Sequence, residues 1–354
     1  MEVERVQFFL LLNKISFERT KIMKEFIIKR LLQIIPVLLG LSILIFFLSR
    51  LMPGDPVRLA LGPEATQEQI EAMEKALGLN ENIFVQYFKY LGGLFTGDWG
   101  MSLQTHRNVF VEIVERFPAT LELTTMAMLI SIIIGVPLGI IAAVKKDKFP
   151  DHFSRILSLG GVAIPKFWLG IMLQLVFAYW FSLLPTVGRG DIIPETITGL
   201  RVIDSLITFN MPALMDSIKH LILPSIALSL GTIAQITRLT RSNMIEQLNR
   251  DYILAATAYG LPKSIVILKY MLKNAFTSTL TVIGLSYGFL LGNAFLVEAV
   301  YGWPGLAQFA IQSVIFKDIN AIVGVTLVIG IIFAITNLII DLIYGFLDPR
   351  IKYD

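Results

Sequence analysis

The sequence predicts an all-α membrane protein with six transmembrane helices. Of its 354 residues, 55% are hydrophobic and only 16% are charged, and the mean hydropathy is +0.70. Soluble domains carry about 25% charged residues, so an ordinary soluble fold is excluded. Six stretches also lack Asp, Glu, Lys and Arg, and each is close to the roughly 20 apolar residues that a helix needs to cross a bilayer. These stretches are residues 31–49, 123–144, 167–188, 220–237, 274–297 and 319–340.

The charge distribution predicts the orientation of the six spans. We place them at residues 28–50, 120–144, 155–184, 218–240, 276–299 and 319–347, the third being hardest to delimit because it contains Pro165 and Lys166. With both termini in the cytoplasm, the inner segments hold 19 Lys and Arg and the outer segments hold 9. Short basic loops stay on the cytoplasmic side. We therefore expect a multi-pass protein of the inner or plasma membrane with both termini inside the cell.

These spans divide the chain into regions of different character. We expect an N-terminal extension at residues 1–22, with a helix lying on the membrane surface as the alternative, and a first transmembrane helix at 23–50. An extracytoplasmic segment follows at 51–118. A five-helix core covers residues 119–347 and includes the cytoplasmic loop 241–273, and residues 348–354 form a cytoplasmic tail.

The extracytoplasmic segment is too long for a simple loop, and its pattern predicts two short helices. Thr66 and Gln69 have the spacing of a capping box, and Gly78 suits the residue after a helix end. A second helix is predicted where Phe84, Tyr87, Phe88 and Leu91 recur at helical spacing. We expect a small helical cap over the outer mouth of the protein.

The cytoplasmic loop between the fourth and fifth spans carries the most informative pattern. Its Ala-rich stretch, residues 251–259, favours a helix. Gly260 permits the positive φ that ends a helix, and Pro262 suits the first turn of a second helix. Small Ala side chains allow such a helix to seat closely against another protein. The alternative is a plain connector between spans.

Several ordered motifs give the chain a resemblance to a known family. They are the turn 53–56, residues 97–102 (Gly-Asp-Trp-Gly-Met-Ser), residues 116–123 at the start of span two, Glu298 with residues 303–306 at the end of span five, residues 337–341 with Tyr344, and residues 348–350. The chain resembles the permease subunits of ABC importers, of the oligopeptide, dipeptide and nickel group and of the dipeptide-permease B type, from about Met23 to Tyr353. The family's loop motif is Glu-Ala-Ala, three residues, Gly. Leu254-Ala255-Ala256 and Gly260 keep its spacing, with Leu254 in place of Glu, and the Leu-Pro that often ends the motif is absent.

The resemblance implies a fold, partners and a site. It implies the type I permease fold, a second homologous permease subunit, two ATP-binding subunits that hold ATP and Mg, and an extracytoplasmic substrate-binding protein. It implies di- or oligopeptides as the substrate, with nickel chelates, glutathione or oligosaccharides as alternatives. In that family the Ala/Gly loop docks on the ATPase. The resemblance therefore implies that a set of loop residues couples ATP hydrolysis on the partner to transport. This set is Asp251, Tyr252, Leu254, Ala255, Ala256, Ala258, Gly260, Leu261 and Pro262.

The residues of the chain itself give little support for catalysis. The sequence has no Gly-x-x-x-x-Gly-Lys-Ser/Thr phosphate loop and no cysteine, so we expect ATP hydrolysis on a partner and no cofactor or metal on this chain. Residues 284–288 match the Gly-x-Ser-x-Gly elbow of hydrolases, but they lie in an apolar span rather than at a strand-to-helix turn. We interpret Gly284, Gly288 and Gly292 as a smooth face for close helix packing. A net charge of +3 is too small to indicate nucleic acid; a stand-alone secondary transporter remains the competing class.

Polar residues inside the spans are candidate pathway groups, because a charge in hydrocarbon costs about 2.5–3.5 kcal/mol on insertion scales. Lys166 either meets a substrate carboxylate or reaches toward the inner surface. Glu298 is equally a gate or a packing group, and Gln235 and Asn293 are weaker candidates for lining the pathway. We expect structural roles for Glu122, as a local pair or cap near Arg116, and for Asp341, in a hydrogen bond with Asn337.

Overall fold

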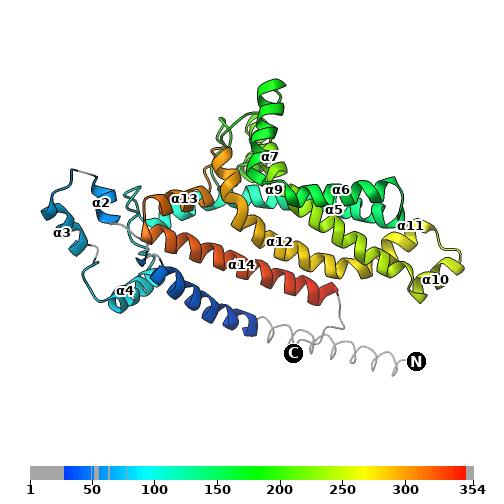
Figure 1. Ribbon diagram of the computed structural model, residues 1–354, viewed down its shortest axis with the longest axis horizontal. Helices are drawn as coiled ribbons and strands as arrows, with labels where there is room; N and C mark the ends of the chain where they lie inside the picture. The colour runs from blue at the N-terminus through cyan, green and yellow to red at the C-terminus, as the bar shows by residue number, and fades with distance from the viewer. Residues whose placement is uncertain (1–27, 49, 52–55, 63, 77, 348–354) are drawn as a thin grey trace, which may run out of the picture.

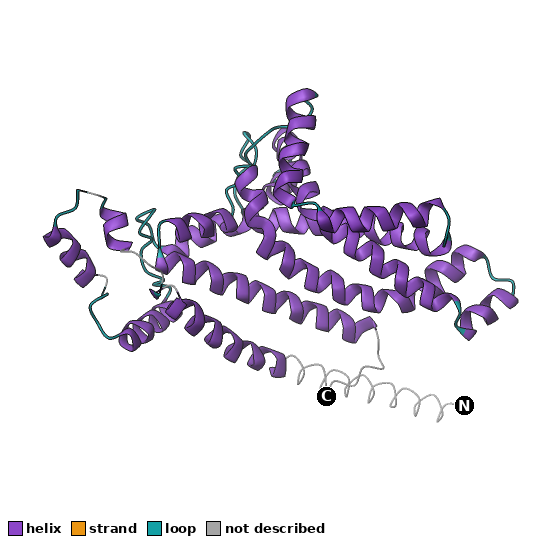
Figure 2. Cartoon of the chain, viewed as in Figure 1, coloured by secondary structure: helices purple, strands orange, loops and turns teal. Residues whose placement is uncertain are grey.

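The computed structural model describes residues 28–347 except residues 49, 52–55, 63 and 77. Helices dominate this described part, which contains one isolated bridge, between Met101 and Asn108, and no strand (Figure 2). The predicted extension at 1–22, the tail at 348–354 and most of the turn at 53–56 lie outside the described residues.

Five described helices are long and apolar enough to cross a membrane, and a sixth crossing is counted if one bent pair is a single span. The five are Ile28–Leu48, α5 (Val109–Val144), α9 (Met211–Leu248), the run Lys263–Val300 that ends in α12 (Leu272–Val300), and α14 (Ile319–Leu347). The spans predicted at 28–50, 120–144, 218–240, 276–299 and 319–347 coincide with these helices. Both α5 and α9 extend well beyond the predicted bounds.

The third predicted span, at 155–184, is broken rather than continuous. α6 (Phe149–Ala163) is bent by 104° relative to the run Lys166–Trp180, which begins with α7 (Lys166–Leu173). Proline removes a helical N–H donor and pushes the preceding residue out of the α region; Ile164 and Pro165 are accordingly extended, with ψ of 123° and 131°. α7 continues as a π-helix, η1 (Gln174–Trp180), and the two project away from the bundle (Figure 1).

The outer segment contains three short helices, α2 (Pro56–Leu61), α3 (Gln67–Ala76) and α4 (Ile83–Thr96). The predicted capping box is confirmed: the Thr66 N–H donates to Gln69 Oε1 at 2.9 Å, and the Gln69 N–H donates to Thr66 Oγ1 at 3.3 Å. Gly78 has a φ of +67°, as expected after a helix end. The second predicted helix corresponds to α4.

The remaining short helices lie near the two ends of the long ones. α8 (Arg201–Ile207) and α13 (Leu306–Ile315) precede α9 and α14, while α10 (Asp251–Ala258) and α11 (Lys263–Ile265) join α9 to α12 through the π-helix η2 (Val266–Met271). Figure 1 shows α3 and α4 at one end of the molecule and α10 and α11 at the opposite end. The long helices therefore separate the predicted outer segment from the predicted cytoplasmic loop.

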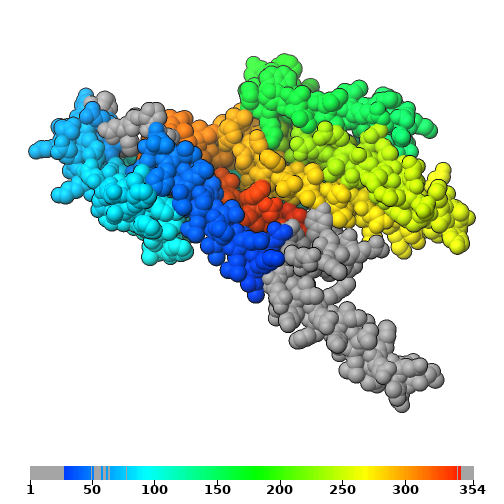
Figure 3. All heavy atoms as spheres, turned by 60° about the horizontal axis from the view of Figure 1, so that its bottom comes forward, coloured from blue at the N-terminus to red at the C-terminus, as the bar shows by residue number. Residues whose placement is uncertain are grey.

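The main core lies where α5, α9 and α12 meet, with Leu123, Leu228 and Leu290 fully buried. The first helix lies against α14, as the space-filling view shows (Figure 3); a Cβ on Gly330 would come within 2.6 Å of Leu41.

Candidate coupling site and translocation residues

The cytoplasmic loop folds into the predicted helix and sharp turn. α10 ends at Ala258, and Gly260 has a φ of +72°. The Gly260 N–H donates to Thr257 O at 3.0 Å, and the Leu261 N–H donates to Ala256 O at 3.2 Å. These two bonds make the Schellman motif, which depends on a left-handed residue after the helix. Pro262 was predicted to lie in the first turn of the second helix. It instead occupies the N-cap position directly before α11.

α10 has a buried face that joins it to the membrane helices. Ile253 and Ala256 are buried in an apolar cluster with Val266 and Met271 of η2, to which α5, α9 and α12 also contribute residues. Tyr252 and Leu261 are half-buried at the edge of this cluster, and the Tyr252 hydroxyl donates to Gln247 Oε1 at 2.5 Å. Burial of apolar side chains is the main stabilising contribution in such a cluster. Ala256 therefore seats α10 on the bundle, and its side chain does not face outward.

The opposite face of α10 is exposed and almost uncharged. Leu254 is 60% exposed and Tyr259 is 87% exposed. The other exposed members of the predicted coupling set are Asp251, Ala255, Ala258, Gly260 and Pro262. Tyr259 is absent from the predicted coupling set. Its position directly before Gly260, the residue that ends the helix, could have indicated an exposed aromatic side chain at the turn. The exposed surface of this loop can receive another protein, while its buried face connects to three long helices.

The four candidate pathway residues are not gathered in one place. Lys166 is half-buried at the start of α7, directly after the break. Gln235 of α9 is exposed, and its Oε1 accepts from Ser286 Oγ of α12 at 3.4 Å. Asn293 of α12 is half-buried and donates to Phe289 O at 2.7 Å. Of these three residues, Gln235 is the one whose hydrogen bond, with Ser286, links two long helices.

Glu298 is fully buried and belongs to a junction at the outer end of α12. The Thr120 hydroxyl donates to Glu298 Oε1 at 2.6 Å, across 178 positions of sequence, and the Gln308 N–H donates to Oε2 at 2.8 Å. A Cβ on Gly305 would collide with the carboxylate. Glu298 is therefore a buried carboxylate that connects α12 to α5 and α13. Its two roles, gate and packing group, stay predictions.

Two sequence motifs meet at this junction. The Trp303 indole N–H donates to Ala119 O at 2.9 Å, and the Leu306 N–H donates to Thr120 Oγ1 at 2.7 Å. The residues that begin span two therefore bind the residues that follow span five.

Glu122 has the structural role that was predicted but a different partner. Arg189 Nη2 donates to Glu122 Oε2 at 2.6 Å, and the Val202 N–H at the start of α8 donates to Oε1 at 2.7 Å. Arg116 instead donates to Glu112 at 2.8 Å. Arg189 was not among the residues singled out from the sequence, because it lies in a loop without periodic pattern. The side chain of Asp341 lies outside the described residues.

Two further carboxylates hold the outer loops. Burial opposes ionisation of Asp204, but donors on Thr198, Ile197 and Gly199 outweigh it and hold the pKa of this carboxyl below its usual range. Asp318 accepts from the Ser102 hydroxyl at 2.5 Å and from the Leu103 N–H at 2.8 Å, and burial raises the pKa of its carboxyl. Asp318 thereby attaches the motif at 97–102 to the start of α14. Sequence analysis did not single out either carboxylate.

The acidic cluster with a histidine in the outer loops is accounted for by internal hydrogen bonds. Ligand atoms of Asp191, Asp216 and His220 lie within 4.8 Å of one another. However, Asp216 Oδ2 accepts from the Asp191 and Ile192 N–H groups at 2.6 and 2.9 Å, and Asp216 Oδ1 lies 3.2 Å from His220 Nδ1. The cluster holds the 188–192 loop on α9.

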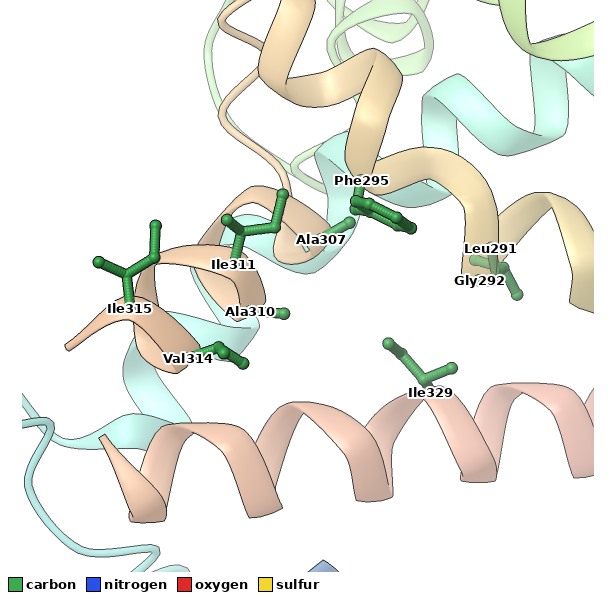
Figure 4. Close-up of a pocket in the computed structure, with 9 residues that line it drawn as sticks. All are labelled: Leu291, Gly292, Phe295, Ala307, Ala310, Ile311, Val314, Ile315 and Ile329. Carbon is green, nitrogen blue, oxygen red and sulfur yellow. The ribbon is translucent and has the colours of Figure 1, made fainter. Parts of the chain in front are cut away.

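The predicted glycine face of α12 is in close contact at two of its three positions. A Cβ at Gly284 would collide with Ile340, and one at Gly288 would collide with Phe333, both on α14. Gly292 has no atom within 4 Å of that position and instead lines an apolar cavity of about 310 Å³ between α12, α13 and α14 (Figure 4). This cavity brings no polar groups together, so it has no substrate-binding character.

Comparisons with known proteins agree with this architecture. The family described as "Binding-protein-dependent transport system inner membrane component" matches residues 135–353, and its N-terminal companion matches residues 23–124. The dipeptide transport system permease protein DppB of Alkalihalophilus pseudofirmus is 43% identical over 334 residues, which cover 94% of this chain and 100% of the relative. The probable D,D-dipeptide transport system permease protein DdpB of Escherichia coli is 39% identical over 318 residues, covering 89% and 94% of the two chains.

A solved structure supports the fold. A chain of the methionine ABC transporter MetNI in an inward-facing conformation is similar, with a TM-score of 0.50 and 18% identity, over 67% of this chain and 96% of that chain. This chain therefore belongs to the family of binding-protein-dependent transport system inner membrane components, as a multi-pass ABC importer permease subunit that works with a partner ATPase and a substrate-binding protein and is not itself the ATPase.

Proposed function

We propose that this chain forms half of the translocation pathway of an ATP-driven importer of di- or oligopeptides, beside a second, homologous permease subunit. The names of both relatives compared above contain the word dipeptide, and the similarity extends over nearly the whole of each chain. Nickel chelates, glutathione and oligosaccharides are the alternatives within the same machinery. The ligand carried by the cognate binding protein distinguishes them.

Both termini and the α10–α11 turn lie on the cytoplasmic side in this proposal. The excess of Lys and Arg in those segments supports this orientation. The position of the outer segment at the opposite end of the long helices is consistent with it. The binding protein then docks on the side of residues 51–118, and the two ATP-binding subunits, which hold ATP and Mg, dock on α10.

The observation that carries the proposal is the two-faced character of α10. Its exposed face, with Leu254, Ala255 and Ala258, is available to an ATPase subunit, and its buried face belongs to an apolar cluster with residues of η2, α5, α9 and α12. A displacement of α10 by the ATPase is therefore passed to three membrane helices. Coupling of this kind requires different contacts in the two states of the transporter.

Lys166 is the strongest candidate for a charged group of the pathway. It is half-buried beside the break in the third span, where the helix direction changes by 104°. A peptide carries a terminal carboxylate, which an ammonium group attracts. Gln235 and Asn293 are proposed as weaker, uncharged lining groups. The alternative for Lys166 is that its ammonium reaches toward the inner surface.

Replacement of Gly260 by Val tests the coupling role. A β-branched residue at a positive φ costs about 1–3 kcal/mol, so the turn that presents α10 is expected to rearrange, although no atom lies within 4 Å of the added Cβ. In the reconstituted complex, we expect ATP hydrolysis to continue while peptide uptake per ATP falls roughly tenfold, within the range of a coupling free energy of 1–3 kcal/mol. The matched control is Gly292→Ala, which adds a methyl group in open space. Unchanged uptake in the Gly260→Val complex contradicts the proposed role.

A further inference from the structure

Asp151 is a fully buried carboxylate that connects two membrane helices. It lies in the first turn of α6 and has no exposed surface. Arg241 of α9 binds it with two groups: Nη2 donates to Oδ2 at 2.8 Å, and Nε donates to Oδ1. Arg155 Nη2 and the Asp147 N–H also donate to Oδ2, at 2.8 and 2.9 Å. A bidentate arginine pair of this kind fixes the mutual orientation of its partners.

The four charges of this group balance. Asp147 and Asp151 face Arg155 and Arg241, and Arg241 is only 19% exposed. Buried ion pairs often contribute little stability compared with apolar packing of the same size. A fixed register between α6 and α9 is therefore a better physical reason for this pair than stability.

Arg241 lies in the part of α9 that is next to α10, which we call the coupling helix. One turn before it, the Thr237 hydroxyl donates to Gly135 O of α5 at 3.2 Å. Just after it, Asn243 Nδ2 donates to Ala275 O of α12 at 3.3 Å. The apolar cluster under α10 contains residues of α5, α9 and α12, but no residue of α6. At this level, the Asp151–Arg241 pair is a direct polar link between α6 and α9, beside the short turn at 145–148 that joins α6 to α5.

α6 leads directly to the break in the third span. Near its other end, Gly161 packs against α9, where an added Cβ would come within 3.0 Å of Ala234 and 3.1 Å of Leu230 O. The bend at Ile164 and Pro165 follows, and Lys166 begins α7. α6 is therefore in contact with α9 near both of its ends and leads directly to Lys166.

We infer that Asp151 is a positioning residue for transport, which locks α6 to α9 in one register so that displacement of the coupling helix reaches the bend at Lys166. This inference rests on the proposed coupling role of α10. Without the bidentate pair, α6 keeps its contact with α9 and its short connection to α5, but hydrogen bonds no longer fix its register on α9, so ATP hydrolysis moves the α6–α7 bend less completely.

The test compares variants of the reconstituted complex, made with both permeases, the ATPase subunits and the binding protein. Asp151→Leu combined with Arg241→Met replaces the pair with apolar groups. Arg241→Lys keeps the positive charge but cannot form the bidentate hydrogen bonds. Asp151→Asn keeps the size of the side chain but removes its negative charge. The control is Glu246→Gln, which removes an exposed ion pair with Arg250 within the same region of α9. The measurements are subunit assembly, melting temperature, ATPase rate and substrate imported per ATP.

We expect the double variant to assemble and hydrolyse ATP like the unchanged complex, while substrate imported per ATP falls roughly fivefold or more. The substrate imported per ATP by Arg241→Lys should lie between the values for the double variant and the unchanged complex. The Glu246→Gln control should match the unchanged complex. If the double variant does not assemble, Arg241→Lys and Asp151→Asn decide the question by the same ratio. An unchanged ratio in variants that assemble overturns the inference.

Gly260→Val is measured in parallel to separate the two proposals. Loss of coupling in Gly260→Val with full coupling in the Asp151 and Arg241 variants overturns only the inference about Asp151. Full coupling in Gly260→Val overturns the coupling role of α10 and, with it, this inference.

Discussion

Glu122, Glu298 and Asp318 each accept a backbone N–H from the first turn of a helix in the region predicted to be extracytoplasmic. The donors are Val202 of α8, Gln308 of α13 and Ala321 of α14. The first N–H groups of a helix lack partners within it, and its positive end favours a carboxylate. These charges, which are unusual in an apolar chain, therefore hold the short outer helices and the start of α14 in place.

Replacement of Glu298 by Gln should destabilise the protein. The amide cannot accept with both atoms, so the Gln308 N–H or the Thr120 hydroxyl loses its partner in a buried site, at a cost of about 1–3 kcal/mol. Thermal unfolding of the purified chain in detergent should show a lower melting temperature. Glu195→Gln, at an exposed position of the outer loops, is the control. A change in transport rate at an unchanged melting temperature would instead indicate a gate.

The sequence predicted the roles of single residues where the interaction is local. The Thr66–Gln69 capping box and the positive φ of Gly260 follow from the spacing of neighbours along one chain segment. The partner of Glu122 could not be predicted in the same way, because Arg189 lies 67 positions away in a loop. Asp151 and Asp318 were missed for the same reason, since their partners lie 90 and 216 positions away.

At the scale of elements, the break in the third span and the close helix contacts have different origins. Pro165 acts on its own backbone, so the sequence indicated where the helix opens, although not the 104° bend, which depends on what α7 packs against. The glycine pattern of α12 predicted close packing at three positions, and Gly284 and Gly288 confirm it while Gly292 does not. Helical periodicity identifies a face but not where the neighbouring helix diverges from it.

Replacement of Gly139 by Ala should weaken the packing of α5 on α9. An added Cβ would come within 2.6 Å of Thr240 Cβ and 2.8 Å of Thr237 O, and neither the threonine Cβ nor the backbone can move freely. Overpacking of this kind costs about 1–3 kcal/mol. Gly160→Ala, where nothing lies within 4 Å, is the control. Thermal unfolding in detergent measures both, and an equal effect of the two variants would contradict the close α5–α9 contact.

At the scale of the whole molecule, the predicted architecture was largely correct because a bilayer restricts what an apolar chain can do. Backbone groups inside hydrocarbon must be paired within the chain, which favours long helices, and the charge-free stretches locate them. The outer junction between residues 119–120 and 298–306 could not be predicted, because nothing in the pattern of either motif identifies the other. The same holds for the seating of α10 on α5, α9 and α12.

The absence of a phosphate-binding loop from the sequence leads to a prediction for the isolated chain. Purified chain in vesicles should not accumulate peptide, either with ATP or with an imposed proton or sodium gradient, because the proposed function assigns ATP to partner subunits and involves no ion relay. Vesicles that also contain the second permease and the ATPase subunits, with binding protein outside and ATP on the ATPase side, should accumulate peptide. Omission of ATP from the complete system is the control. Accumulation by the isolated chain against a peptide gradient would make it a secondary transporter, since the proposed function requires the free energy for transport to enter through α10 from a partner.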